Sequence, residues 1–169
     1  MGIKQELERF AGQVGFTLAY LDETTSTNDV ARDPRYDAGA VVIAERQSRG
    51  RGQRGNSWSS SAGANLTFSI VLCPGFLEAA QQFYLSKAVS LAVCDTVESF
   101  GVRPQVKWPN DIYIDGRKVA GILIENDLAG NFLSRSVVGI GINVNQTEFD
   151  PALPNPTSLA VAAGRKLDR

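Results

Sequence analysis

Hydrophobic residues recur along the chain with two different spacings. Helical spacing, with an apolar residue every three or four positions, occurs over residues 3–14 and again over 77–100, where Gly101 suits the end of a helix. A short continuous apolar run instead predicts a buried strand at 40–44, and strands are also predicted at 16–21 and 65–72. The first half of the chain is therefore expected to mix helices with strands.

In the second half of the chain, turn residues separate the predicted strands. An extended segment is expected at 106–108 and to continue at 112–114, and the dipeptide Asp115-Gly116 is a strong signal for a tight hairpin. The predicted return strand covers 118–125, a second turn covers 127–131, and a long strand covers 133–144. Consecutive strands joined by tight turns indicate antiparallel pairing.

Two short helices complete the expected set. Ser26, followed three residues later by Asp29, resembles a helix start, and the helix should stop before Pro34. A second short helix is expected from Thr157 or Ser158 to Ala163. The fold class is therefore predicted to be α+β, with a mixed, largely antiparallel sheet backed by helices, in a single domain covering residues 1–169.

Composition excludes several kinds of chemistry. The 169 residues contain no histidine, so neither a Ser-His-Asp nor a Cys-His mechanism can be built. Cys73 and Cys94 lie among apolar neighbours and are expected to be small buried residues rather than a disulfide framework. The net charge of −1 and the absence of a long apolar run argue against nucleic acid and membrane as partners, and favour a cytoplasmic protein.

Residues 46–64 form a long segment rich in glycine, arginine and serine, with few side chains able to pack. Its run Gly50-Arg51-Gly52-Gln53-Arg54-Gly55 matches G-x-G-x-x-G, but a strand rather than a helix follows it, so a dinucleotide site is rejected. Glycines let backbone amides approach an anion, arginines can bind phosphate or carboxylate oxygens, and Trp58 can cover a flat ring. The alternative is a basic, solvated loop.

The segment Lys107-Trp108-Pro109-Asn110-Asp111 also carries candidate chemistry. A lysine can neutralise a phosphate group, and an aspartate can hold Mg²⁺ beside it. Composition alone fits an Asn-Asp turn with a surface lysine equally well. Further along, Gly139 and Gly141 leave room for a ligand close to a strand, although a bulged strand would also use glycine.

Several of these segments, taken in order, resemble the biotin protein ligases. The matching pieces are Thr25-Ser26-Thr27-Asn28, Gln47 with Gly50-Arg51-Gly52 and Trp58, Gly63-Ala64-Asn65-Leu66, Lys107-Trp108-Pro109-Asn110-Asp111, Lys118 with Ala120-Gly121-Ile122-Leu123-Ile124-Glu125, Gly139-Ile140-Gly141-Ile142-Asn143, and Thr157-Ser158-Leu159. Each motif is modest alone, but their order is specific. The resemblance covers about residues 16–163.

The resemblance implies a class II aminoacyl-tRNA synthetase-like fold and a two-step reaction. Biotin would react with ATP to give biotinyl-adenylate, and a lysine of a biotin carboxyl carrier protein would then accept the biotin. The implied catalytic residues are Lys118, Arg51 and Lys107. The implied biotin-binding residues are Ser26, Thr27, Gln47, Gly50, Arg51, Lys118, Gly121, Leu123 and Gly139. Arg54, Trp58, Asn110 and Asn143 would bind the nucleotide, and Asp111 would serve Mg²⁺.

Departures from the family pattern and rival interpretations complete the expectations. Gln53 and Asn56 stand where many members have arginine, so weaker retention of the adenylate is expected. Neither an N-terminal DNA-binding domain nor the usual small C-terminal SH3-like barrel is expected. The resemblance admits a homodimer without indicating its residues. The alternatives are a lipoate or octanoate ligase or transferase of the same fold, and a biotin-binding core without catalytic activity.

Overall fold

The computed structural model describes residues 2–169, and these contain a seven-stranded sheet. Its order is β1-β2-β3-β7-β6-β5-β4. The strands are β1 (Leu18–Thr24), β2 (Val41–Gln47), β3 (Leu66–Leu72), β4 (Pro104–Lys107), β5 (Asp111–Ile114), β6 (Arg117–Ala129) and β7 (Phe132–Ile142). Pairing is antiparallel between all neighbours except β1 and β2, which run parallel. The predicted mixed, largely antiparallel sheet is confirmed.

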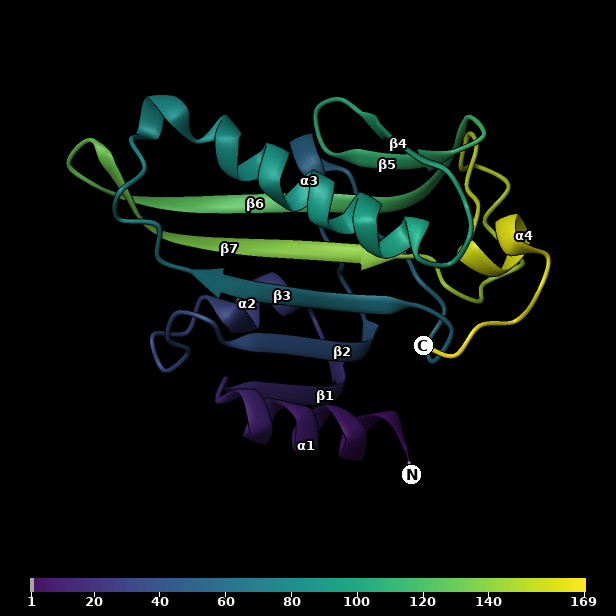
Figure 1. The fold of residues 1–169 in the computed structure, drawn as a ribbon, viewed down its shortest axis with the longest axis horizontal. Helices are drawn as coiled ribbons and strands as arrows, with labels where there is room; N and C mark the ends of the chain where they lie inside the picture. The colour runs from purple at the N-terminus through teal and green to yellow at the C-terminus, as the bar shows by residue number, and fades with distance from the viewer. Residues whose placement is uncertain (1) are drawn as a thin grey trace.

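Helices cover both faces of the sheet. They are α1 (Ile3–Val14), α2 (Thr27–Ala31), α3 (Phe83–Glu98) and α4 (Leu159–Ala163), with 3₁₀ turns at η1 (Gln53–Gly55) and η2 (Ala79–Gln81). The long helix α3 lies across one face, and the short α2 lies behind β2 and β3 on the other (Figure 1). None of the helices in residues 2–169 is long and apolar enough to cross a membrane.

The period of two along β6 and β7 separates the two faces chemically. Even-numbered residues such as Ile122 and Ile140 are buried in the larger core, together with Val93 and Val97 of α3. Odd-numbered residues point to the opposite face, since successive strand side chains alternate. There Val137 joins a smaller core that α2 covers. Burial of apolar side chains on both faces fixes the register, because a slip of one residue would exchange the faces.

Several predicted boundaries were wrong for identifiable reasons. The helix predicted for 77–100 begins only at Phe83, because the backbone at Leu77 and Ala79 bonds to Leu133 and Asn131 instead. The turn predicted at 127–131 is shorter. The β6–β7 ladder continues through Asp127 and Leu128, with a register shift between them, as far as the pair formed by Ala129 and Phe132.

Two further expectations need correction. The extended segments predicted at 106–108 and 112–114 are not one continuous run. They are antiparallel partners, with Lys107 opposite Asp111 and a cis peptide bond between Trp108 and Pro109 in the connecting turn. Cys73 is exposed rather than buried, because it follows the last residue of β3, whereas Cys94 is partly buried.

We expect the larger core to be sensitive to loss of volume at Ile112, which is fully buried. The substitution Ile112→Ala should lower the free energy of unfolding by about 2–5 kcal/mol, since it removes buried methyl groups and leaves a cavity. Urea denaturation followed by circular dichroism measures this change. The matched control is Leu128→Ala, whose side chain is 57% exposed and should change stability by no more than about 0.5 kcal/mol. Equal effects of the two substitutions would contradict this description of the core.

Candidate active site

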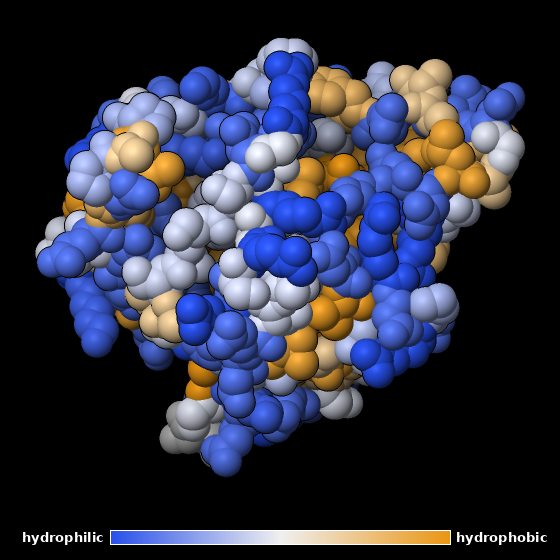
Figure 2. Space-filling view, turned by 180° about the vertical axis from the view of Figure 1, so that it is seen from behind, coloured by the Kyte–Doolittle hydropathy of each residue, from blue (hydrophilic) through white to orange (hydrophobic). Residues whose placement is uncertain are grey.

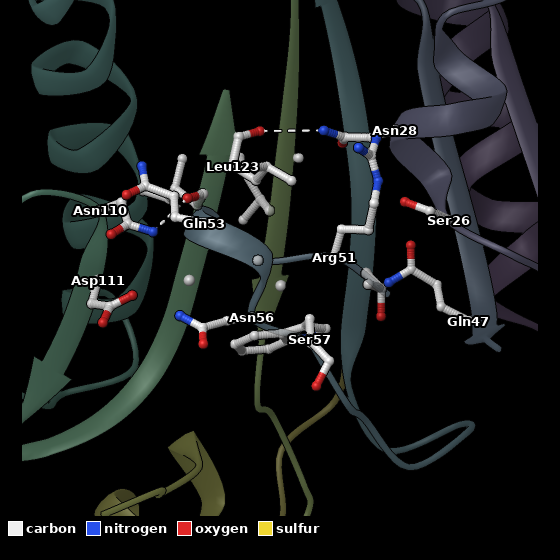
Figure 3. Close-up of a pocket in the computed structure, with 18 of the residues that line it drawn as sticks. Ser26, Asn28, Gln47, Arg51, Gln53, Asn56, Ser57, Asn110, Asp111 and Leu123 are labelled. Atoms are coloured by element: carbon white, nitrogen blue, oxygen red, sulfur yellow. Dashed lines mark hydrogen bonds between the residues drawn. The ribbon is translucent and has the colours of Figure 1, made fainter. Parts of the chain in front are cut away.

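The connection between β2 and β3, residues 48–65, folds back over the face of the sheet opposite α3. We call it the Gly-Arg loop. Together with α2 and the turn between β4 and β5 it encloses a cavity of about 210 Å³ (Figure 3). Figure 2, which views the molecule from behind Figure 1, shows strongly hydrophilic residues across this side, with hydrophobic residues visible between them. The lining of the cavity combines polar side chains such as Gln47 and Lys118 with apolar ones such as Trp58 and Leu123.

The floor of the cavity follows from strand register. Gly121 of β6 pairs with Gly141 of β7, which also pairs with Thr67 of β3. The next row holds Leu123, Gly139 and Ser69. Three of these six positions are therefore glycine on the same face. Glycine leaves the backbone of a central sheet open to close approach by another group.

Trp58 occupies part of this open surface. Its indole ring lies against Gly121 and Gly141, and a methyl group added at Gly141 would overlap the ring. The indole N–H of Trp58 is buried and lacks a hydrogen-bond partner within residues 2–169. A side chain at Gly50 would collide with the carbonyl of Trp58, whose amide donates to the Gly50 carbonyl at 2.9 Å. Glycine is thus required at Gly50 for the Gly-Arg loop to close.

The end of the cavity beside α2 presents neutral hydroxyl and amide groups, next to the ion pair of Arg51 with Asp29 of α2. The Gln47 carbonyl oxygen accepts hydrogen bonds from the amide of Thr27 at 2.7 Å and from its hydroxyl at 3.2 Å. Ser69 donates to Asn28 Oδ1 at 2.6 Å. Ser26 precedes α2, but its hydroxyl makes no capping hydrogen bond. Amide and hydroxyl groups of this kind suit a small, neutral, polar ligand group.

The opposite end, below β5 and β6, is charged. Lys118 Nζ lies 2.7 Å from Asp111 Oδ1 and 5.7 Å from the centre of the Trp58 ring. Asn110 donates from Nδ2 to the Ile122 carbonyl at 2.8 Å, which fixes the turn beside Asp111. Arg54 lines this cavity from the Gly-Arg loop, in the left-handed region at φ 55°. The cationic groups of Lys118 and Arg54 beside this partly enclosed space favour an anion, and Asp111 offsets part of the charge of Lys118.

The carboxylate of Glu125 on β6 binds the Gly-Arg loop through Arg51. Glu125 accepts two hydrogen bonds from Arg51, at 3.0 and 2.7 Å, and a third from Asn28 at 2.8 Å. Burial acts to raise the pKa of Glu125, but these hydrogen bonds and the charges of Arg51 and Arg32 outweigh it, so its pKa is lowered. Glu125 is therefore held in its ionised form.

Most of the residues predicted for the site line this one cavity. They are Ser26, Thr27, Gln47, Arg51, Arg54, Trp58, Asn110, Asp111, Lys118, Gly121, Leu123 and Gly139. They come from separate segments of the chain, and the strand register and the closed loop bring them together. Their contacts with ligands stay predictions.

Three predicted residues lie outside the cavity lining. Gly50 supports the loop backbone. Lys107 donates to the Tyr113 hydroxyl at 3.0 Å, and this hydrogen bond raises the lysine pKa. Asn143 is buried and donates to the Thr157 carbonyl at 3.0 Å, which fastens the segment leading into α4. In this conformation the two side chains of Lys107 and Asn143 therefore serve structural contacts.

Several lining residues were not predicted as site residues. They are Asn28, Gly52, Gln53, Asn56, Ser57, Thr67, Pro109, Ile122, Ile140 and Gly141. Three of them had been considered without a binding role: Gly141 as leaving room for a ligand, and Gln53 and Asn56 as departures from the family pattern. Asn28 was detectable as the last member of a matching motif. Thr67 carried no signal, because only the pairing of β3 with β7 places it opposite Gly141. Ser57 likewise reaches the cavity only through the fold of the loop.

Residues 2–169 contain no group of three or more Asp, Glu or Cys side chains able to hold a metal ion by themselves. Asp111 is a single carboxylate, one-fifth exposed, beside the cavity. Mg²⁺ is commonly held by one or two carboxylates together with the phosphates of a substrate. Asp111 fits a metal ion only in that shared form.

Comparison with known proteins agrees with this geometry. Residues 18–143 match the model of the biotin/lipoate A/B protein ligase family. The chain is 36% identical to the bifunctional ligase/repressor BirA of Bacillus subtilis, covering 99% of this chain and 52% of that protein. It is also 36% identical to the biotin–[acetyl-CoA-carboxylase] ligase of Paracoccus denitrificans, covering 88% of this chain and 65% of that protein.

The fold agrees as well. A biotin protein ligase from Aquifex aeolicus, solved in complex with biotin and ATP, superposes with a TM-score of 0.77 at 34% identity, over 90% of this chain and 63% of that one. The chain thus spans from about half to two-thirds of the length of these relatives. The matched segment includes the strands and the Gly-Arg loop that enclose the cavity. This chain belongs to the biotin/lipoate A/B protein ligase family.

Proposed function

We propose that this chain activates biotin with ATP to form biotinyl-adenylate, and that the biotin then passes to a lysine of a biotin carboxyl carrier protein. The observation that carries the proposal is a single cavity with neutral hydroxyl and amide groups at one end, a glycine floor, and the cationic groups of Lys118 and Arg54, with Asp111 beside Lys118, at the other end. Such a cavity matches a ligand with a polar ring at one end and a carboxylate at the other. The names of the relatives support biotin as that ligand.

The neutral end would bind the ureido ring of biotin. Ser26, Thr27 and Gln47 offer hydroxyl and amide groups, which can match both the N–H groups and the carbonyl of a urea. Gly139 and Leu123 would border the ring through their backbone. A site built to satisfy several hydrogen bonds rejects ligands that lack them, because its own polar groups would be left unpaired.

The cationic end would hold the reacting groups. In the first step an oxygen of the biotin carboxylate bonds to the α-phosphorus of ATP, the bond to the β-phosphate breaks, and pyrophosphate leaves. Lys118, which lines the cavity beside Asp111, would neutralise charge on the carboxylate and the phosphate. In the second step the acceptor amine bonds to the acyl carbon and AMP leaves. Neither step needs a protein nucleophile, which agrees with a chain that lacks histidine.

The nucleotide would bind around Trp58, Arg54 and Asn110, which line the same cavity. Asp111, with the phosphates of ATP, would hold Mg²⁺, which would supply further neutralisation of the phosphate charge. Lys107 and Asn143 would have to leave their present partners to reach the nucleotide.

The first prediction concerns Lys118. On this chain, ATP–pyrophosphate exchange should depend on biotin, and Lys118→Met should slow it by roughly a hundredfold or more, since a positioned charge stabilises the transition state. The matched control is Lys87→Met, on α3 at the other face of the sheet, where the ammonium group lies over Phe83 and Tyr84. It should leave the exchange rate unchanged.

The alternatives predict different outcomes of the same assay. Exchange stimulated by lipoate in preference to biotin would identify a lipoate ligase of the same fold. Binding of biotin without exchange would identify a binding core without catalytic activity. Exchange that Lys118→Met and Lys87→Met reduce equally would contradict the role given to Lys118.

The second prediction concerns Gln53, which lines the cavity from the Gly-Arg loop. A positive charge there should add an electrostatic contact to the adenylate. We expect Gln53→Arg to slow the release of biotinyl-adenylate by about twofold to tenfold, as a partly exposed charged contact would. Rapid filtration of enzyme loaded with radiolabelled biotin measures the release. Gln105→Arg, on the exposed edge strand β4, is the control. Equal release from Gln53→Arg and the parent protein would exclude this effect.

A further inference from the structure

We infer that Glu125 is a positioning residue that holds the Gly-Arg loop closed over the cavity by fixing the guanidinium of Arg51. Its consequence for the reaction, retention of the adenylate, rests on the proposed function. The contact between Arg51 and Glu125 does not depend on the proposed function. We call the contact between Arg51 and Glu125 the loop ion pair.

The loop ion pair has the geometry of a specific contact. Arg51 Nη1 and Nη2 donate to the two oxygens of Glu125 at 3.0 and 2.7 Å, in the two-pronged arrangement that suits a guanidinium and a carboxylate. Nη2 also lies 2.8 Å from an oxygen of Asp29 at the start of α2. The side chain of Glu125 is 18% exposed, and that of Arg51 is 39% exposed. Partial burial reduces screening by solvent.

The carboxylate of Glu125 is itself held in place by Asn28 of α2. Asn28 donates to it at 2.8 Å, and Asn28 in turn accepts a hydrogen bond from the buried Ser69. A side chain at Gly139 would overlap Asn28, so the glycine floor makes room for this support. The chain of contacts runs from β3 through α2 to β6, all on the cavity face. The carboxylate therefore has a fixed position before the loop reaches it.

The surroundings of Arg51 distinguish this role from direct charge neutralisation. Two carboxylates, Glu125 and Asp29, already face its guanidinium. With its charge compensated in this way, Arg51 in this conformation has little attraction left for a third anion. In this conformation Arg51 instead holds the loop in place, since it connects the first part of the Gly-Arg loop to β6 of the sheet. The loop also carries Trp58, Arg54 and Gln53, and these line the cavity only while the loop is closed.

Closure of the loop matters most for a reactive intermediate. An acyl-adenylate is lost by release into solvent or by hydrolysis, and a closed loop limits both. Opening of the loop would therefore act on retention more than on formation of the intermediate. Glu125 forms ion pairs with Arg51 and Arg32, whereas Lys118 and Asp111 pair with each other at the other end of the cavity.

The test uses Glu125→Gln, Arg51→Gln and the double variant of the whole chain. Asp127→Asn is the matched control, because Asp127 lies two residues further along β6 on the same face, is exposed, and contacts Arg32 at 4.0 Å rather than the loop. Hydrogen exchange measured by mass spectrometry reports opening of residues 48–57 without any ligand. Release of biotinyl-adenylate and ATP–pyrophosphate exchange report the reaction.

We expect each single variant to speed amide exchange in 48–57 by about fivefold, the size of a partly exposed ion pair, and the double variant to add nothing further. Adenylate release should rise by a similar factor. In Glu125→Gln, which leaves the cavity-lining residues intact, the maximal pyrophosphate exchange rate should stay within about twofold and the thermal midpoint should follow that of Asp127→Asn.

The inference would be overturned by unchanged amide exchange of residues 48–57 in Glu125→Gln and Arg51→Gln. Additive effects of the two substitutions in the double variant would also overturn it. If Glu125→Gln does not fold, amide exchange of residues 48–57 in Arg51→Gln decides the inference alone. A parent protein that forms no adenylate would refute the proposed function, whereas loop exchange would still decide on the loop ion pair. Faster amide exchange in residues 48–57 together with unchanged adenylate release would show that the loop ion pair does not retain the adenylate.

Discussion

The pairing of β6 with β7 is the constraint on which the rest of the structure depends. It sets Gly121 opposite Gly141 and Leu123 opposite Gly139, while Ile122 and Ile140 bury on the other face against α3. The apolar core fixes this register, since a slip of one residue would move isoleucines into the cavity and glycines into the core. The stability of the fold and the shape of the site therefore come from one set of pairings.

The glycine floor explains why two other segments can lie so close to the sheet. Trp58 packs on Gly121 and Gly141, and Asn28 packs over Gly139. Through these contacts Trp58 of the Gly-Arg loop and Asn28 of α2 lie against different parts of the glycine floor. The polar end and the cationic end are then separated by the floor between them, as a ligand with a polar ring and a distant carboxylate requires. The loop ion pair completes the enclosure.

Local sequence was sufficient for the elements whose side chains have a regular period or a clear turn. The helix at 3–14 was predicted with its observed ends, and Asp115-Gly116 gave the hairpin between β5 and β6. Contacts between distant segments were not accessible. Cys73 is exposed because of where β3 ends, and Thr67 reaches the cavity only through its pairing with β7. The contact between Arg51 and Glu125 joins residues 74 positions apart, so neither local spacing nor composition could predict it.

The most direct test of the central claim is a crystal structure of this chain with a non-hydrolysable analogue of biotinyl-adenylate. The account predicts the bicyclic ring beside Ser26, Thr27 and Gln47, the acyl-phosphate mimic within reach of Lys118, and the Gly-Arg loop closed over both. A ligand bound elsewhere, for example in the apolar groove between α3 and Trp108, would contradict it. So would a ligand in the cavity with the ring at the cationic end.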